Sequence, residues 1–459
     1  MSDFDVIVVG SGATGAAVAW RLCTKGFKVA CVERGPRVDP DTLPASYSNW
    51  EWHKVKKANP AAGTRTHAGD YPVDDSASPI AVCNYNGVGG STLIYSAHFP
   101  RFRPPDFRTK TDHGVGEDWP ITYDTLRPYF DLNEQENGVS GLSGDPAYPE
   151  IENTHPPVPL GQAGSRLAQA FNDHGWHWWP SFGATLPNPD PAGPDWTKSS
   201  ADLTYLPKAE AAGLTLLPDT AVSHVLTQGD RAMGLACFDK DRRGFELRAR
   251  HIVLAGSALG TPRILLNSAS AAHPKGLCNS SDQVGRNLML HPLGYVEGVF
   301  DETFDIDTRP QGCLFHSHQF YRAHDADHDL GYMMQALRMP GPAESALGAH
   351  SRRKLKFGTR VYDDFEALFR KQMVIAIVCE DLPEPDNRVE LMLDRPDRFG
   401  TPGLRVNYAL SDNSRKLLNH GMTRAREVLA TAGARRSFVF GPVRNTGWHI
   451  MGTARMGKD

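Results

Sequence analysis

A glycine-rich turn near the beginning of the chain has the spacing that dinucleotide binding requires. Gly10, Gly12 and Gly15 follow an apolar run at residues 5–9, and Glu33 ends the next apolar run. In such a turn the first glycine allows the sharp bend, the second lets the backbone approach a pyrophosphate, and the third lets a helix pack closely on a strand. The unpaired N–H groups at the positive end of that helix then bind the anion. The pattern predicts a dinucleotide site; a turn without a ligand is the alternative, which the neighbouring strand, helix and acid disfavour.

Glu33 and the strands that come later in the sequence indicate which dinucleotide binds. A carboxylate at the end of the second strand accepts hydrogen bonds from the ribose hydroxyls of an adenosine and opposes a 2′-phosphate. FAD and NAD share this fingerprint, but its place at the amino end, and a β-meander predicted before an apolar run at 251–256, favour FAD. A second glycine fingerprint, which a separate NAD(P)H site would need, is absent from the sequence.

The elements that must position these residues follow from hydrophobic patterning. Strands at 5–9 and 28–32 flank a helix at 16–25, which is the opening unit of a parallel sheet. The meander is predicted from four short strand patterns, at 214–217, 221–226, 232–238 and 245–250. Longer strands and one amphipathic helix follow, at 295–300, 373–378, 388–393, 404–408 and 413–432.

These patterns predict an α/β fold with two domains. Residues 1–295 are expected to form an FAD-binding Rossmann-like domain, a parallel sheet with a β-meander, which residues 445–459 complete. Many prolines mark residues 151–200 as a loop-rich excursion from this domain. Residues 296–444 are expected to form an α+β substrate-binding domain with an antiparallel sheet.

Composition excludes several classes of protein. The 459 residues carry 49 Lys+Arg against 53 Asp+Glu, so no basic field attracts nucleic acid. No apolar run is long enough for a membrane span, and the amino end lacks the basic region of a signal peptide. The seven cysteines are scattered and never spaced as C-x-x-C, which favours a reducing compartment, and we expect a cytoplasmic protein.

Further motifs recur along nearly the whole chain. They are Gly87–Thr92 with Pro100-Arg101 and 105–107, Asp118–Ile121, Ser257–Ser268, Val284–Leu288 with His291, Asn387–Val389, and His449-x-x-Gly452-Thr453-x-Arg455-Met456-Gly457. In these patches the sequence resembles the glucose-methanol-choline (GMC) oxidoreductases. The run Ala97–Arg101 with Tyr95 is closer to the bacterial sugar-acid and polyol dehydrogenases of that family.

The resemblance implies an FAD-dependent oxidoreductase that acts on the CH–OH group of an alcohol, sugar or polyol, with dioxygen, a quinone or a cytochrome as electron acceptor. It implies that His449 is the general base that accompanies hydride transfer to the flavin N5. Ile94 stands where some relatives attach the flavin through a histidine, so FAD is expected to bind without a covalent bond. The predicted FAD-binding residues are Gly10, Gly12, Ala13, Thr14, Gly15, Glu33, Arg34, Val88, Gly89, Gly90, Ser91, Thr92, Val222, Ala255 and Gly256.

One departure from the family keeps alternatives open. Family members continue beyond the His449 motif and supply a second active-site His or Asn, whereas this sequence ends at Asp459, so we expect a fragment. A non-catalytic or incomplete flavoprotein is one alternative. An NAD(P)H-dependent flavin monooxygenase or reductase is the other, which the single fingerprint disfavours.

Two polar or aromatic clusters receive structural interpretations. His316, His318, His324 and His328 have no common metal-ligand spacing, so no metal site is predicted and a solvated polar loop is favoured. Trp176, Trp178 and Trp179 are interpreted as a packed or edge-exposed aromatic cluster, with the lining of a substrate entrance as the alternative.

Overall fold

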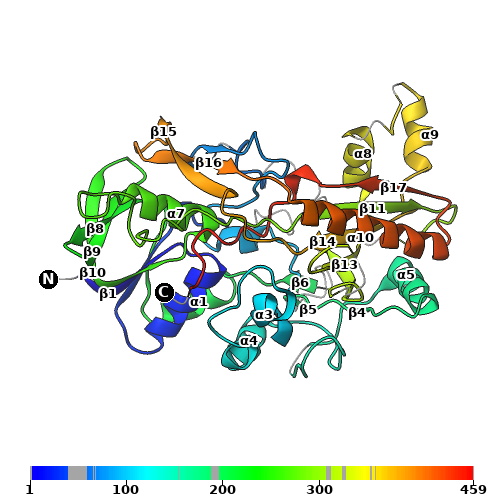
Figure 1. Ribbon diagram of the computed structural model, residues 1–459, viewed down its shortest axis with the longest axis horizontal. Coiled ribbons are helices and arrows are strands. Elements are labelled where there is room, and N and C mark those ends of the chain that lie inside the picture. The colour runs from blue at the N-terminus through cyan, green and yellow to red at the C-terminus, as the bar shows by residue number, and fades with distance from the viewer. Residues whose placement is uncertain are drawn as a thin grey trace.

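The computed structural model describes residues 3–39, 59–65, 67, 69–152, 155–187, 196–305, 312–322, 327–351, 354–356 and 358–457. Two six-stranded sheets dominate this part of the chain and lie toward opposite ends of its long axis (Figure 1). The first holds the glycine turn, and the second is antiparallel. The predicted fold class, a Rossmann-like domain with a parallel sheet and a β-meander and a second α+β domain with an antiparallel sheet, is confirmed.

The first sheet has the strand order β7-β2-β1-β10-β9-β8. Its strands are β1 (Phe4–Val9), β2 (Val29–Val32), β7 (Thr215–Leu217), β8 (Ala221–Gln228), β9 (Arg231–Phe238) and β10 (Gly244–Leu254). Val6 and Val8 pack on the side of helices α1 (Ala13–Cys23) and α6 (Tyr205–Ala211), while Ile7 and Val9 pack on the side of α7 (Ser257–Asn267). Successive side chains of a strand point to opposite faces, so a strand covered on both faces is a continuous apolar run.

The β-meander differs from the prediction in two ways. The patterns at 245–250 and 251–256 form one strand, β10, which pairs antiparallel with β9 along Gly244–Arg248 and parallel with β1 along Ala249–Leu254. The pattern at 214–217 lies outside the meander, because β7 pairs parallel with β2. Hydrophobic periodicity reports which face of a strand is buried and not which strand lies beside it.

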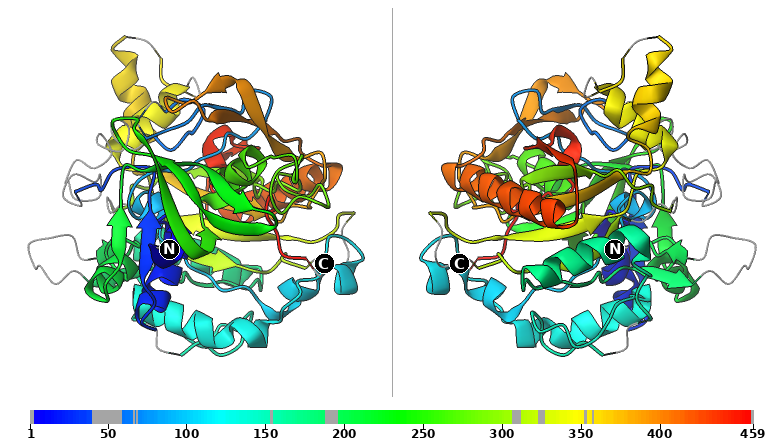
Figure 2. Two further views of the ribbon diagram at one scale, coloured as in Figure 1. Left: turned by 90° about the vertical axis from the view of Figure 1, so that its left-hand side faces the viewer. Right: turned by 90° about the vertical axis from the view of Figure 1, so that its right-hand side faces the viewer.

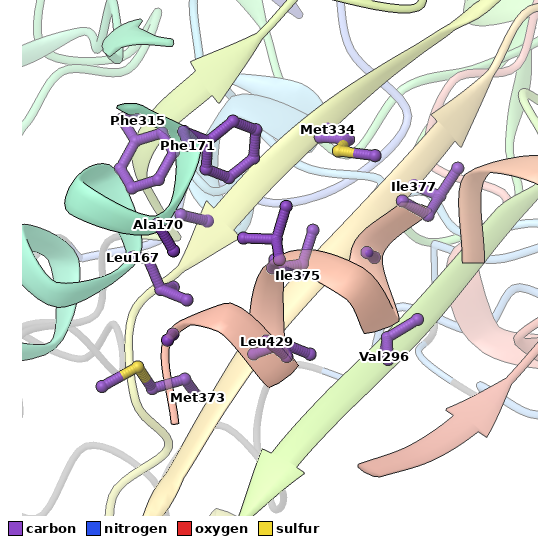
Figure 3. Close-up of a cluster of buried hydrophobic side chains, with 14 of the residues drawn as sticks. Leu167, Ala170, Phe171, Val296, Phe315, Met334, Met373, Ile375, Ile377 and Leu429 are labelled. Carbon is purple, nitrogen blue, oxygen red and sulfur yellow. The ribbon is translucent and has the colours of Figure 1, made fainter. Parts of the chain in front are cut away.

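The second sheet is antiparallel throughout, with the order β17-β11-β14-β13-β12-β4. Its strands are β4 (Trp179–Pro180), β11 (Leu293–Val299), β12 (Cys313–Ser317), β13 (Tyr332–Leu337), β14 (Gln372–Cys379) and β17 (Arg436–Phe440). Helices α5 (Gly161–Asp173) and α10 (Asp412–Thr431) cover one face. Figure 3 shows Leu167 and Phe171 of α5 beside Phe315 and Ile375 of the sheet. Burying such a side chain contributes about 1.5–3 kcal/mol.

Two segments pack against a different part of the protein from the domain to which the sequence assigned them. Helix α5 and strand β4 belong to the Pro-rich stretch at 151–200, yet they pack on the second sheet. Strands β15 (Arg388–Pro396) and β16 (Pro402–Asn407) come from the predicted substrate-binding domain, yet β16 pairs with β3 (Val73–Asp74), and both contact α7. The domain boundaries at 295 and 444 remain a prediction. In the structure, α5 and β4 lie with the second sheet, whereas β15 and β16 lie beside β3 and α7.

The remaining elements frame this core. They are α3 (Thr109–His113), α4 (Tyr123–Asn137), α8 (Pro342–Ser351), α9 (Arg360–Glu366), β5 (Thr185–Pro187), β6 (Trp196–Lys198) and three short 3₁₀ turns, η3 (Gly90–Leu93), η4 (Pro104–Arg108) and η5 (Arg444–Thr446). Figure 2 shows α8 and α9, in yellow, projecting from the body of the protein. Among the helices that the structure describes, none has the length and apolarity that crossing a membrane requires.

Candidate active site

The glycine turn between β1 and α1 can be formed only by glycine at two of its positions. Gly10 has φ +97°, and a Cβ atom on it would lie 2.6 Å from the carbonyl oxygen of Ala255. A Cβ on Gly15 would lie 1.8 Å from the carbonyl oxygen of Gly10. Gly12 meets no such obstacle, since the nearest atom to its Cβ position is 3.8 Å away. Packing therefore explains Gly10 and Gly15, whereas the bare backbone at Gly12 and the start of α1 without a side-chain cap fit a bound pyrophosphate.

Glu33 directly follows β2 and is buried beside this turn. Its Oε2 accepts hydrogen bonds from Ser11 N and Ser11 Oγ, both at 2.9 Å, and its Oε1 accepts one from Gly35 N at 3.0 Å. Burial raises the pKa of Glu33, while these hydrogen bonds act in the opposite direction. A carboxylate has about four lone-pair sites, so Oε1 retains one acceptor site for a ribose hydroxyl.

A second glycine turn, Gly87–Thr92, touches the first. Gly89 and Gly90 both have positive φ, and a Cβ on Gly90 would lie 2.7 Å from Gly12 Cα. Gly89 N donates to Ser11 Oγ at 3.4 Å. Two turns that are 78 residues apart in sequence thus form one glycine-lined surface.

The other predicted FAD-binding residues occupy three places. Ala255 and Gly256 link β10 to α7 and adjoin the glycine turn. Val222 is buried on β8, and the residues before β8 reach Glu33, where Thr220 N donates to the Glu33 carbonyl at 2.9 Å. The Arg34 side chain is engaged elsewhere, since its Nη2 lies 2.5 Å from Asp397 Oδ2.

The candidate base His449 lies on a loop that is fixed to another loop. Met289 and Met451 exchange two backbone hydrogen bonds, of 3.0 and 3.1 Å. A Cβ on Gly452 would lie 1.8 Å from the carbonyl oxygen of Asn287, so only glycine allows this close approach. Thr453 Oγ1 donates to the Ala258 carbonyl at 2.7 Å. The loop that carries His449 is therefore anchored at the start of α7, next to the glycine turn.

Two further histidines lie around His449. His291 Nδ1 is 3.1 Å from His449 Nδ1, and the two rings are nearly perpendicular. His98 interacts electrostatically with His449, and its Nδ1 lies 2.8 Å from Ser181 Oγ. Desolvation by the surrounding protein lowers the pKa of His98 and of His291 to about 3, and it lowers the pKa of His449 below its ordinary value although His449 is solvent-exposed. All three imidazoles are therefore neutral near neutral pH, the form in which an imidazole accepts a proton.

His291 and His98 lie in the sequence motifs, but the sequence predicts no role for either residue. Both stand in runs that carry the resemblance, at 284–291 and 97–101. Their approach to His449 depends on tertiary structure, which motif spacing does not report.

The interpretation of the histidines at 316–328 as a solvated loop is wrong for the three that the structure describes, because His316, His318 and His328 are all buried. His316 is fully buried on β12 and lies 3.2 Å from Asp145 Oδ2, while His318 Nε2 lies 2.9 Å from Tyr148 Oη. The pattern failed because the pair begins in a buried strand. His324 lies outside the described residues.

The tryptophan cluster is packed, as one interpretation held. Trp176 stacks on His174 at 4.5 Å and meets Phe320 edge-on at 4.8 Å. Trp178 packs on Phe315 at 5.4 Å. These rings therefore support the second sheet and its helices.

Comparisons with known proteins agree with this architecture. Family models described as GMC oxidoreductase match residues 4–293 and 383–459. A 2-methyl-1,2-propanediol dehydrogenase from Mycolicibacterium austroafricanum is 36% identical over 99% of this chain and 86% of that protein. The fructose dehydrogenase large subunit of Gluconobacter japonicus is 25% identical over 99% of this chain and 88% of its own length. The fold of pyridoxine 4-oxidase from Mesorbium loti superposes with a TM-score of 0.69 at 17% identity, covering 100% of this chain and 90% of that one.

The matches at both ends of the chain and the relative that is similar along nearly all of it lead to one conclusion. This chain belongs to the GMC oxidoreductases, a family of FAD-dependent enzymes.

Proposed function

We propose that this protein oxidises the CH–OH group of a small diol or polyol, with non-covalently bound FAD and with His449 as the general base. The observation that carries the proposal is the placement of a neutral imidazole on a loop that is anchored beside the glycine turn. When bound, FAD supplies the acceptor for the hydride that leaves the donor carbon. The glycine surface at Gly12 and Gly90 and the acceptor at Glu33 fit its pyrophosphate and its ribose.

His449 has the properties that the proton-transfer half of this reaction needs. Oxidation of an alcohol removes a proton from the hydroxyl oxygen as the hydride leaves carbon, and a positioned base contributes about 10²–10⁴ in rate. Desolvation lowers the pKa of His449, so its ring is neutral and can accept this proton near neutral pH. The imidazolium that results carries a positive charge that stabilises developing negative charge nearby.

The relatives support the donor class. The names of these two relatives specify 2-methyl-1,2-propanediol and fructose, each of which carries more than one hydroxyl group. We propose a small vicinal diol as the first donor to test, and dioxygen, a quinone and a cytochrome as electron acceptors to compare. A cytoplasmic location also remains a proposal, supported by the absence of disulfide bonds among the seven cysteines, all of which lie within the described ranges.

The test is anaerobic reduction of the purified protein by alcohols. The parent protein should be yellow, contain about one FAD per chain and lose its colour when 1,2-propanediol is added without oxygen. His449→Ala should keep the colour and be reduced about 10²–10⁴-fold more slowly. His350→Ala, at an exposed position of α8, is the matched control and should behave as the parent. A colourless parent, or one that only NAD(P)H bleaches, would contradict the proposal.

A further inference from the structure

We propose that His291 is a positioning residue for His449: it accepts the Nδ1 proton of His449, so that His449 Nε2 is the nitrogen that takes the proton of the donor hydroxyl. This inference rests on the proposed function and assigns a role to a residue that the family resemblance left without one.

Only one proton can lie between the Nδ1 atoms of His291 and His449. The two Nδ1 atoms lie 3.1 Å apart, so one ring donates and the other accepts. A neutral imidazole has one N–H and one lone pair on its two nitrogens. If His449 donates from Nδ1, its Nε2 has a lone pair and can act as a base. If His449 accepts at Nδ1, its Nε2 carries the proton and cannot act as a base. The direction of this one hydrogen bond therefore decides whether His449 Nε2 can take a proton.

The backbone holds His291 in an uncommon conformation at this place. Its φ of +47° lies in the left-handed region, which costs a non-glycine residue free energy and is found where surrounding structure imposes it. The preceding residue supplies part of that structure, because Leu290 is fully buried and its N–H donates to Asp381 Oδ2 at 3.1 Å. The exchange of hydrogen bonds between Met289 and Met451 fixes the two loops together. Strain maintained at this position favours a functional role for the side chain.

The electrostatic surroundings favour one proton shared by the pair. Among the described residues, His449 is the titratable group that acts on His291, and His98 is a third imidazole that interacts with His449. No carboxylate acts on either ring in this part of the structure, so the acceptor for the Nδ1 proton is the other imidazole. Burial and the neighbouring ring keep His291 neutral, with its pKa lowered to about 3.

The resulting step balances. The C–H bond of the donor breaks and its electron pair leaves with the hydrogen as hydride to the cofactor, while the O–H proton passes to His449 Nε2 and the C=O bond forms. His449 is then an imidazolium whose Nδ1–H points at the lone pair of neutral His291. A hydrogen bond from a charged donor is stronger than the neutral one that preceded it, so the contact gains strength as the reaction proceeds.

Two substitutions separate this role from simple packing. His291→Leu fills a similar volume without an acceptor, whereas His291→Asn retains a side-chain oxygen at about the position of Nδ1. With full FAD content, the flavin of His291→Leu should be reduced about 10- to 100-fold more slowly at saturating 1,2-propanediol. This factor corresponds to the loss of one hydrogen bond to a charged group. The KM should change little, and His291→Asn should recover most of the rate. The low-pH limb of the rate profile should move to lower pH in His291→Leu, because the His449 cation loses its acceptor.

A measurement that does not depend on turnover completes the test. Nitrogen-15 NMR of histidine-labelled holoenzyme, with His449→Ala to assign the signal, should show His449 protonated at Nδ1 in the resting parent. An Nε2-protonated His449, a His291→Leu variant as fast as the parent, or a His291→Asn variant as slow as His291→Leu would overturn the inference. If alcohols bleach the parent and His449→Ala is slow while His291→Leu is not, only this inference fails. A parent that no alcohol bleaches overturns the proposed function, and the inference with it.

Discussion

Asp397 joins two arginines from different parts of the chain, and replacing it by asparagine should strongly destabilise the protein. Its Oδ2 lies 2.5 Å from Arg34 Nη2, just after β2, and 2.8 Å from Arg263 Nη2 on α7. Its Oδ1 accepts from the backbone N–H groups of Phe399 and Thr401. The carboxylate thus ties the turn between β15 and β16 to the FAD-binding sheet.

The magnitude follows from the burial of the three groups. The side chains of Asp397, Arg263 and Arg34 are 0%, 2% and 13% exposed, so Asp397→Asn leaves two nearly buried guanidinium groups without a counter-charge. Breaking a buried ion pair in this way costs about 3–5 kcal/mol of unfolding free energy. Asp74→Asn is the matched control near the same strands, because Asp74 lies 3.8 Å from Arg395 and from Arg405, which are 56% and 49% exposed. Exposed pairs of this kind contribute about 1 kcal/mol or less.

The assay is urea unfolding of parent and variants, followed by tryptophan fluorescence at several pH values. Burial raises the pKa of Asp397, but the positive charges of Arg34 and Arg263 outweigh this effect and hold that pKa below its ordinary value. Stability from a carboxylate with a lowered pKa is present above the unfolded-state value of about 4 and is lost as the pH falls below it. The difference between parent and Asp397→Asn should therefore be large near neutral pH and shrink in acid. A variant within about 1 kcal/mol of the parent near neutral pH would refute the reasoning.

Three further results are expected. Gly15→Ala should purify without FAD, measured as visible absorbance per chain, because its Cβ would lie 1.8 Å from the Gly10 carbonyl oxygen; a fully yellow variant would contradict the geometry of the turn. The rate of anaerobic flavin reduction should fall only below pH ~6.5, because desolvation lowers the pKa of His449 and the neutral ring is the base; a midpoint above that value would contradict the assignment. Asp145→Asn should lower the thermal midpoint near neutral pH by an amount equivalent to about 1–3 kcal/mol. The substitution weakens the contacts of Asp145 with His177 at 2.9 Å and with buried His316 at 3.2 Å. An unchanged melting curve would exclude a structural role for Asp145. The pKa of Asp145 is lowered, in spite of burial, by hydrogen bonds from these two histidines, so this loss should diminish as the pH falls below about 4.

The sequence was most informative where one local pattern fixes one local structure. Residues 6–9 of β1 and all of β2 are continuous apolar runs, and the glycine turn between the two strands has steric requirements that only glycine meets at Gly10 and Gly15. Helix α10 was predicted within a residue at each end, because Ser411 caps it and its apolar stripe faces the second sheet. In these places the local sequence is sufficient to predict the local structure.

Prediction failed where partners are far apart in sequence. The two neighbours of β10 are chosen by tertiary packing, so its pattern was divided into two strands. The prolines at 151–200 indicated a loop, although α5 and β4 lie in that stretch and pack on the second sheet. His291 meets His449 across 158 residues of sequence, and no spacing rule connects them. Motif resemblance located His449, and only the structure located its partner.

The most direct test of the central claim is anaerobic reduction of the parent holoenzyme by 1,2-propanediol with and without deuterium on the hydroxyl-bearing carbons. If the donor loses hydride from carbon while His449 takes the hydroxyl proton, the flavin should bleach and deuteration should slow the bleaching several-fold. Flavin that stays oxidised with every alcohol and sugar tested, yet bleaches at once with NADH or NADPH, would contradict the account.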